Sequence, residues 1–401
     1  MSGRISTFGM YSQALTAMLA RQSEAARTQL QLSSNSKLLS ASDDPVGAGI
    51  GVMLDRATAE LDRYHSNATL VTNRLNLEET ALVTVGDRLS RIRELAVEAS
   101  NDSQSAESRA DIVAELKQQY DGLIAAANST DGNGRYLFAG SQDATAPFAK
   151  ASGGVTYSGD QVQRSVDVSA NVAVGDSDAG SDVFLRVRTG NGTFAARANP
   201  ANAGSLVMSA SALSNPAAWD GGTYTVRFDG AGNYQVTDAS STVVSSGAYT
   251  PGSAIQFRGV QLTFDGTPAA GDSFGVQPSP TQDLFATVQK LIGTASAPST
   301  TPSQKAAQRN GFYASLEDLD LAETHVTGVR AGVGARLNTL DTTATERDAQ
   351  NVSIKSSLSD LRDLDYAEAA SRLSMQMTAL QAAQQTFQKV QGSSLFDYLR
   401  G

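Results

Sequence analysis

Few residues of this chain have the type and spacing that chemistry requires. There is no cysteine, which excludes disulfides, thiol catalysis and cysteine-held metal sites. The two histidines, His65 and His325, each lie inside a long helical pattern, with no second histidine or cysteine at ligand spacing. No Ser–His–Asp group can be assembled from them. We therefore expect a protein that is not an enzyme, with no catalytic residue, no cofactor and no metal.

An acidic pair, Asp43 and Asp44, stands directly before Pro45. Two adjacent carboxylates could serve acid–base chemistry or bind a cation. The same residues also fit the start of a helix, in which Ser42 or an aspartate is the cap and Pro45 is the first helical residue. The carboxylates would then complement the N-terminal dipole of that helix. We expect the capped turn.

Two further motifs have a chemical alternative. The segment Asp176–Asp182 is similar to a calcium loop, but its glycine comes one position early and Val187 occupies the place of the bidentate glutamate. The segment Gly47–Gly51 contains three glycines, but no strand precedes it and its spacing differs from that of a dinucleotide-binding turn. We expect a solvated loop at the first segment and close helix packing at the second.

The composition and the periodicity of the chain indicate the fold in which these segments lie. The chain has 31 basic and 41 acidic residues, and its net charge of −10 disfavours nucleic acid or an anionic membrane as a partner. Residues 1–130 and 281–401 are poor in Gly and Pro and have helical periodicity, whereas 140–280 has short alternating runs bounded by turn residues. We predict an α+β fold, with an antiparallel β-rich domain inserted into a long coiled-coil-like helical bundle formed by the N- and C-terminal segments.

One apolar register runs through the first helical region. From Leu54 to Ala99, steps of three and four residues connect small or apolar side chains, and only Glu78 is charged. Between those ends, the register contains Ala57, Leu61, Tyr64, Ala68, Val71, Leu75, Leu82, Val85, Leu89, Ile92 and Ala96. A helix over these residues would be about 70 Å long, which favours packing against other long helices.

The remaining elements follow from shorter patterns. Further helical stripes and alternating runs are separated by polar or glycine-rich breaks. The helical stripes are Val113–Ala127, Leu284–Ile292 and a long one from Ser303, and the alternating runs are Asp182–Arg188, Thr223–Val236 and Val260–Gly266. We predict helices at the stripes and β-hairpin strands at the alternating runs.

The two chain ends carry similar seams that contain glutamine. The predicted subunit-interaction seam consists of Leu15, Met18, Gln22, Ala25, Gln29 and Leu32 near the start, and Leu373, Met377, Leu380, Gln384, Phe387 and Gln391 near the end. Polar seam residues lower stability but help to fix register and partner number. Helices of this kind are marginal in isolation. We expect them to be ordered by pairing with each other or with neighbouring subunits, as elements of assembly.

Three motifs resemble the flagellin family. Ser40–Pro45 followed by Val46–Ile50 is similar to the N-terminal signature of that family. Arg330–Leu340, and then Asp360–Ala369 with Gln381–Phe387, are similar to its C-terminal segments. The motifs occur in the family's order, and the resemblance covers residues 1 to about 140 and about 281 to 401.

The extreme ends narrow the resemblance to the hook-associated branch of the family. Arg4–Tyr11 and Ser393–Leu399 resemble the ends of hook-associated subunits, whereas filament flagellins usually begin differently. Gly271–Val276 is similar to a short segment of hook-associated β domains. Most of the β insert departs from any family pattern, so its role stays open.

The resemblance implies a structural subunit of the bacterial flagellum that joins the hook to the filament. Its implied partners are the adjacent hook-associated junction protein, flagellin, further copies of itself in a ring, and an export chaperone. Met1–Phe8 lacks the apolar core of a signal peptide, and no stretch reaches the roughly 18 apolar residues of a membrane span. These features alone suggest a cytoplasmic protein; the resemblance implies type III export to the extracellular flagellum without signal cleavage.

The domain boundaries follow from the same patterns. We expect terminal helices over 1–42 and 360–401 that pair on assembly, a helical rod domain over 43–139 and 281–359, and the inserted β-rich domain over 140–280. A filament flagellin is the first alternative. A surface adhesin carried on a helical stalk is a further one, opposed by the pairing of the chain ends.

Overall fold

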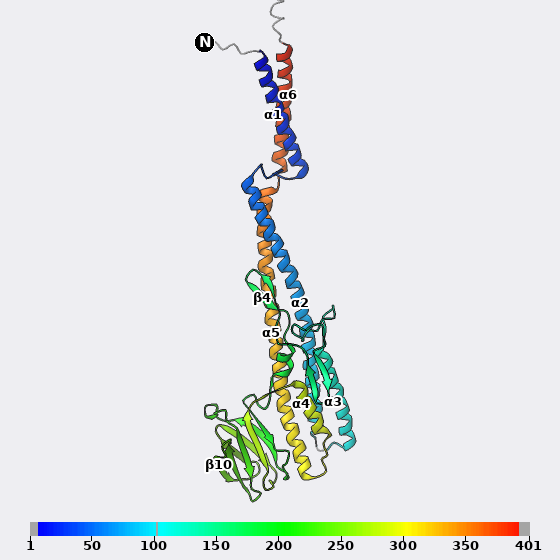
Figure 1. Ribbon diagram of the computed structural model, residues 1–401, viewed down its shortest axis with the longest axis vertical. Coiled ribbons are helices and arrows are strands. Elements are labelled where there is room, and N and C mark those ends of the chain that lie inside the picture. The colour runs from blue at the N-terminus through cyan, green and yellow to red at the C-terminus, as the bar shows by residue number, and fades with distance from the viewer. Residues whose placement is uncertain (1–6, 102, 393–401) are drawn as a thin grey trace, which may run out of the picture. The chain divides into compact units, whose positions relative to one another are not determined.

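The computed structural model describes residues 7–101 and 103–392 of the 401-residue chain. Helices come first and last, with the strands between them (Figure 1). The helices are α1 (Thr7–Ser34), α2 (Pro45–Ala99), α3 (Ala106–Ala127), α4 (Leu284–Ser296), α5 (Pro302–Arg362) and α6 (Tyr366–Gly392). The strands are β1 (Phe148–Ala151), β2 (Gly154–Tyr157), β3 (Ser165–Ser169), β4 (Val172–Gly175), β5 (Val187–Arg188), β6 (Phe194–Ala198), β7 (Val207–Leu213), β8 (Tyr224–Phe228), β9 (Asn233–Asp238), β10 (Val243–Ala248), β11 (Ala254–Phe257), β12 (Val260–Asp265), β13 (Ser273–Pro278) and β14 (Thr281–Gln282). The α+β class with an inserted antiparallel region is confirmed.

The chain divides into two compact units. The terminal unit comprises Met1–His65 and Ala344–Gly401, and the central unit comprises Ser66–Thr343. Helices α2 and α5 each pass through both units because each is far longer than an ordinary globular helix. Within the described ranges, no helix is both long and apolar enough to span a membrane.

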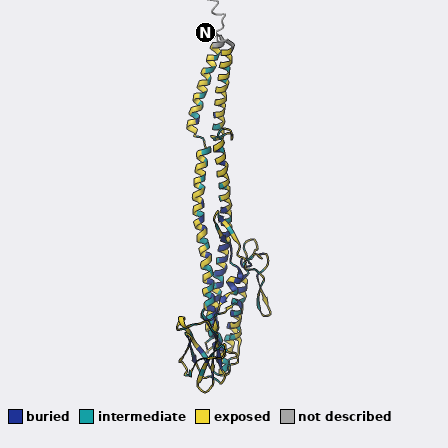
Figure 2. Ribbon diagram, turned by 60° about the vertical axis from the view of Figure 1, so that its left-hand side comes forward, coloured by how far each residue is buried: buried dark blue, intermediate teal, exposed yellow. Residues whose placement is uncertain are grey.

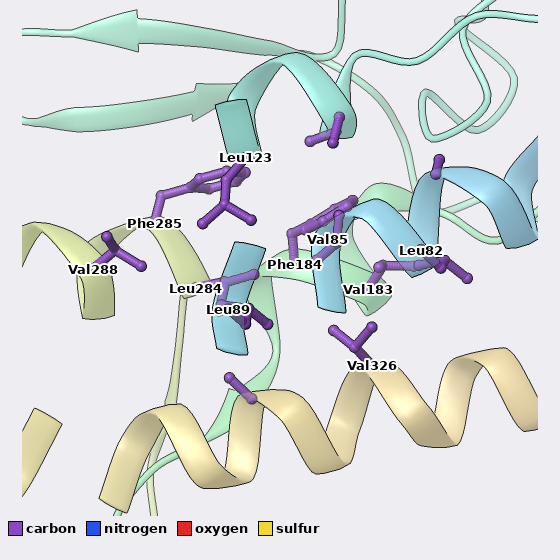
Figure 3. Packing of buried hydrophobic residues seen from close by; sticks show 14 of the residues in the cluster. Leu82, Val85, Leu89, Leu123, Val183, Phe184, Leu284, Phe285, Val288 and Val326 are labelled. Carbon is purple, nitrogen blue, oxygen red and sulfur yellow. The ribbon is translucent and has the colours of Figure 1, made fainter. Parts of the chain in front are cut away.

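The helical core of the central unit forms along α2. Every position of the predicted register from Ala68 to Ala99 is buried, which confirms that register within this unit. Figure 3 shows side chains of α2, α3, α4 and α5 meeting in this core, together with side chains of η1 (Ser181–Leu185), a π-helical turn. Phe184 of η1 lies 5.2 Å from Phe138 and 5.8 Å from Phe285, between ring centroids. The apolar side chains at helical spacing therefore form one core to which helices from the N-terminal and C-terminal parts of the chain contribute.

The prediction of a strand at Asp182–Arg188 is wrong over most of its length. The structure has the turn η1 followed by the two-residue strand β5. Val183 and Phe184 are adjacent, and both lie fully buried in the same helical core. A strand would have sent them to opposite faces. Burial against the helices outweighed the local alternation.

The β region beyond η1 has its own core. A five-stranded antiparallel sheet runs in the order β10-β9-β8-β13-β6, and a three-stranded one in the order β11-β12-β7. Phe228, Phe264 and Phe274 are fully buried between them. The predicted hairpin at Thr223–Val236 is confirmed as β8 and β9, joined by a turn in which Asp229 accepts amide hydrogen bonds.

Helix α5 covers the open edge of β7. The side-chain amide of Asn310 donates to Leu206 O (2.9 Å) and accepts from Met208 N (2.8 Å), as a neighbouring strand would. Tyr313 lies one turn further along α5, and its hydroxyl accepts from Ser211 N at 2.9 Å. Edge strands present unpaired backbone groups that otherwise attract other strands. The helix therefore protects this edge.

The edge strand of the other sheet, β6, is tied to the same helix. Arg197 of β6 forms ion pairs with Glu317 (3.3 Å) and Asp318 (2.5 Å) of α5. Asp318 also accepts from Gly190 N at 2.7 Å. Consecutive turns of α5 therefore hold both β6 and β7, and the β region is anchored to the helical core of the central unit.

Candidate assembly surface

The terminal unit consists mainly of paired helices. Helices α1 and α6 run side by side in it (Figure 1). The ring centroids of Tyr11 and Phe387 lie 5.1 Å apart. At the other end of the pair, Lys37 N donates to Arg362 O at 2.7 Å. The pairing joins the first and last described segments of the chain.

The predicted seam residues fall into three groups. Ala25 is buried, and Leu15, Met18, Leu32, Leu373, Leu380 and Phe387 are half-buried. Gln22, Gln29, Met377 and Gln384 are exposed in the single chain. Gln391 lies in α6, but its side chain is outside the described part. Part of the predicted seam thus lies inward, and its role between subunits stays a prediction.

Next to three of the exposed seam positions, the neighbouring residue faces the other helix in place of the predicted one. We call the residues of α1 and α6 that lie inward the inward stripe. Thr28 is buried beside Gln29, and Gln376 and Ala383 lie inward beside Met377 and Gln384. Ala369 is also fully buried, and sequence reasoning missed it. Alanine, threonine and glutamine carry little apolar signal, so the periodicity of larger side chains did not reveal these positions.

The terminal unit has almost no core of its own. Among its described residues, the buried apolar side chains are Ala25, Tyr64 and Ala369. Twelve of its large hydrophobic side chains are exposed. They are Tyr11, Leu19, Leu30, Leu39, Val46, Ile50, Val52, Met53, Val352, Tyr366, Met375 and Met377. In Figure 2 the helices of this unit are largely yellow, the colour of exposed residues. Because large exposed apolar patches are typical of interaction sites, we take the terminal unit as the candidate assembly surface.

The acidic pair before Pro45 is structural. Asp44 caps α2 by accepting from Gly47 N at 2.9 Å, which confirms the predicted capped turn. Asp43 accepts from two backbone amides of the preceding turn, Leu39 N and Ser40 N, both at 3.1 Å. Burial raises the pKa of Asp43, but those two donors and the nearby Arg27 outweigh it and hold the pKa below its usual value.

Charge in the terminal unit is nearly balanced. Its sequence contains 12 basic and 13 acidic residues, so most of the chain's net charge of −10 lies in the central unit. Asp55 and Arg362 form a bidentate pair at 2.8 and 2.5 Å, and the Arg362 hydrogen bond lowers the pKa of Asp55. A nearly neutral unit repels another protein less than a strongly charged unit would.

The remaining candidate residues are held by internal contacts. His65 and Arg347 interact at 3.3 Å within the terminal unit, and His325 Nε2 lies 2.8 Å from Asp182 O. The expectation of a solvated loop at Asp176–Asp182 is wrong over most of that segment, because Asp176, Ser177, Ala179 and Ser181 are buried. Asp176 also pairs with arginine side chains. No group of three or more His, Asp or Glu side chains among the described residues could hold a metal ion.

Comparisons with known families cover most of the chain. The bacterial flagellin N-terminal helical region matches residues 5–143, and the bacterial flagellin C-terminal helical region matches 316–399. Between them, residues 197–278 match the D2-like domain of flagellar hook-associated protein 1, which includes the segment Gly271–Val276. Both the helical ends and the insert therefore have relatives among flagellar proteins.

Individual relatives match along nearly their whole length. Flagellar hook-associated protein 3 of Salmonella typhimurium is 27% identical over 99% of this chain and 100% of its own. The crystal structure of FlgL from Xanthomonas campestris is 40% identical, with a TM-score of 0.72 over 76% of this chain and 99% of that one. The flagellar junction protein FlgL from Legionella pneumophila is 30% identical, with a TM-score of 0.70 over 78% of this chain and 100% of that one.

Proposed function

The chain belongs to the family of flagellar hook-associated protein 3 (FlgL), and from that membership we propose that it is the structural subunit joining the flagellar hook to the filament. Support comes from relatives described as hook-associated or junction proteins that match along their whole length. The flagellin of Clostridium tyrobutyricum matches only 33% of this chain, which favours the junction role over a filament subunit.

The main structural support for this proposal is the exposed apolar surface of the terminal unit. A unit that buries so few apolar side chains and exposes twelve large ones gains stability by burying them against neighbours. Full burial of one such side chain contributes about 1.5–3 kcal/mol, so even partial burial of the set would contribute on the order of 10 kcal/mol. We infer that neighbouring copies in a ring supply that surface, and that Gln22, Gln29 and Gln384 set the register between copies.

Several finer assignments belong to the same proposal. The neighbours are the adjacent hook-associated junction protein and flagellin, with an export chaperone bound before assembly. The protein acts outside the cell, as a structural and not a catalytic component. We keep the division into terminal helices (1–42 and 360–401), rod domain (43–139 and 281–359) and β insert (140–280) as part of the proposal.

Deletion of the gene in its own bacterium tests the proposed role. The expected cells carry hooks without attached filaments and release flagellin into the medium, which electron microscopy and immunoblotting detect. Hooks that still carry filaments would contradict the junction role. Purified protein that extends into long filaments on a seed of its own kind would favour a filament flagellin.

Substitution within the inward stripe tests assembly through the terminal helices. Leu15→Asp or Leu380→Asp places a charge between α1 and α6, and either change should abolish motility while the β region stays folded. Ser23→Asp, at an exposed position of α1, is the matched control and should swim normally. Normal motility of the leucine variants would contradict assembly through paired ends.

A further inference from the structure

A short loop of the central unit links the two long helices. It runs from Gly175, the last residue of β4, to Gly180, and Asp178 makes its key contacts. Asp178 N donates to Glu78 Oε1 of α2 at 2.9 Å, while the Asp178 carboxylate pairs with Arg336 of α5. Asp178 therefore contacts both α2 and α5.

Glu78 is the charged residue of the predicted α2 register, and it is fully buried. Its second carboxyl oxygen, Oε2, has no hydrogen-bond partner. Removing an ionised carboxylate from water without full hydrogen bonding costs several kcal/mol, so such a group retains a proton instead. The geometry alone indicates that Glu78 is neutral in the folded chain.

The surrounding cations are engaged by other groups. Arg336 binds the Asp178 carboxylate and also donates to Gly175 O at 3.4 Å. On α2, one turn before Glu78, Arg74 binds Asp131 (3.1 Å) and Tyr136 O (3.0 Å). No hydrogen bond joins either guanidinium to Glu78 among the described residues. Arg336 therefore acts on Glu78 through its charge alone, without a hydrogen bond.

The other charged groups around the loop are paired among themselves. Asp176 pairs with Arg164, and its Oδ2 lies 3.7 Å from Nε of Arg74. Arg164 also reaches Asp143 at 3.5 Å. Beside Glu78 on α2, Glu79 pairs with Arg330 of α5 at 2.6 Å. Asp178 is the acidic residue that contacts Glu78, and its carboxylate also accepts from Gln163 Nε2 at 2.8 Å.

We propose that Glu78 and Asp178 share one proton, which fastens the Gly175–Gly180 loop across α2 and α5, and that loss of this proton to solvent releases the loop. In the closed state, the Glu78 O–H donates to the Asp178 carboxylate while Glu78 Oε1 accepts from Asp178 N. Once Glu78 has lost the proton, its carboxylate and that of Asp178 are both charged, and their repulsion drives the loop away from α2.

The direction of the pH effect follows from linkage. Burial, and then the Asp178 carboxylate, raise the pKa of Glu78 to about 8, against the opposing effects of Asp178 N and Arg336. The folded chain therefore binds a proton more tightly than the unfolded chain does. The free energy of unfolding falls as the pH rises from the usual carboxyl pKa towards 8, and the loop opens above 8.

Hydrogen exchange of the full chain between pH 6 and 9.5 tests the proposal. After correction for intrinsic exchange rates, protection of the 175–185 segment should fall about tenfold for each pH unit above 8. Glu78→Gln, whose neutral amide both accepts from Asp178 N and donates to its carboxylate, should retain protection throughout. Protection that is independent of pH in the unsubstituted chain, or that falls equally in Glu78→Gln, would overturn the proposal.

Two further variants separate the shared proton from general effects of charge. Glu79→Gln removes the adjacent carboxylate and should leave the pH dependence of loop protection unchanged. Asp178→Asn removes the proton's partner and should abolish the fall near pH 8. The proposal holds that residue 78 is neutral at pH 6, so the neutral glutamine of Glu78→Gln should be tolerated there. Failure of this variant to fold at pH 6 would therefore also count against the proposal.

Discussion

Replacement of Asn310 by alanine removes both hydrogen bonds that the Asn310 side chain makes with the edge of β7. The amide of Asn310 pairs with Leu206 O and Met208 N, and Asn310 is 8% exposed. The substitution leaves one backbone donor and one acceptor without these partners. It also favours the helix slightly, because alanine has the higher helix propensity, so any loss of stability reflects the contact with the strand.

The structure sets the expected magnitude. A buried polar group left unpaired costs about 1–3 kcal/mol, and two such groups would cost about 2–6 kcal/mol. A cavity of about 310 Å³ adjoins the site and is lined by Asn310, Leu206 and Gly311 among others. Water entering it can partner one of the freed groups. We therefore expect a loss of about 2–4 kcal/mol in the free energy of unfolding.

Urea unfolding of the full chain, followed through Trp219 fluorescence, measures this loss because Trp219 packs in the β core. Lys305→Ala, at an exposed position of the same helix, is the control and should change the free energy by less than about 0.5 kcal/mol. Asn310→Asp should also be destabilised, because a carboxylate cannot donate to Leu206 O. The reasoning is refuted if Asn310→Ala and Lys305→Ala have the same unfolding midpoint.

Three further predictions concern packing, capping and the chain ends. Phe184→Ala empties the centre of the aromatic cluster and should cost about 3–5 kcal/mol in thermal or urea unfolding; a smaller loss than that of Leu70→Ala, at an exposed position, would contradict it. Asp44→Ala removes the cap of α2 and should cost about 0.5–2 kcal/mol, whereas Asp348→Ala, at an exposed helix position, should be near neutral. In the monomer, proteases should cut within 7–34 and 366–392 before the central unit, as mass spectrometry of early fragments would establish; simultaneous cleavage throughout would argue against marginal terminal helices.

The sequence predicted those parts of the fold whose energetics are local or periodic. The α2 register from Ala68 to Ala99 was correct because large apolar side chains recur there at helical spacing and all of them are buried. The cap at Asp44 and the β8–β9 hairpin were correct because residue type alone favours those turns. Such features depend little on distant segments.

Other features depend on contacts far apart in the chain, and the sequence did not reveal them. Phe184 lies in a π-helical turn and not in the predicted strand, because burying both Phe184 and Val183 in the helical core outweighs the local alternation. Asp176 is buried because arginines from separate elements converge on it. In the candidate assembly surface, Ala369 and Thr28 lie inward although neither contributes much apolar signal. These outcomes follow from three-dimensional proximity that one-dimensional periodicity does not encode.

The contact of α5 with both sheet edges limits how this protein can evolve. One insertion or deletion within Asn310–Asp318 would rotate every later side chain by about 100° around the helix axis. Asn310 could then no longer reach β7 while Asp318 reaches Arg197 of β6. Substitutions in the exposed loops of the insert leave this alignment intact. We therefore expect related genes to vary freely in the loops of the insert while keeping a constant residue count along this stretch of α5.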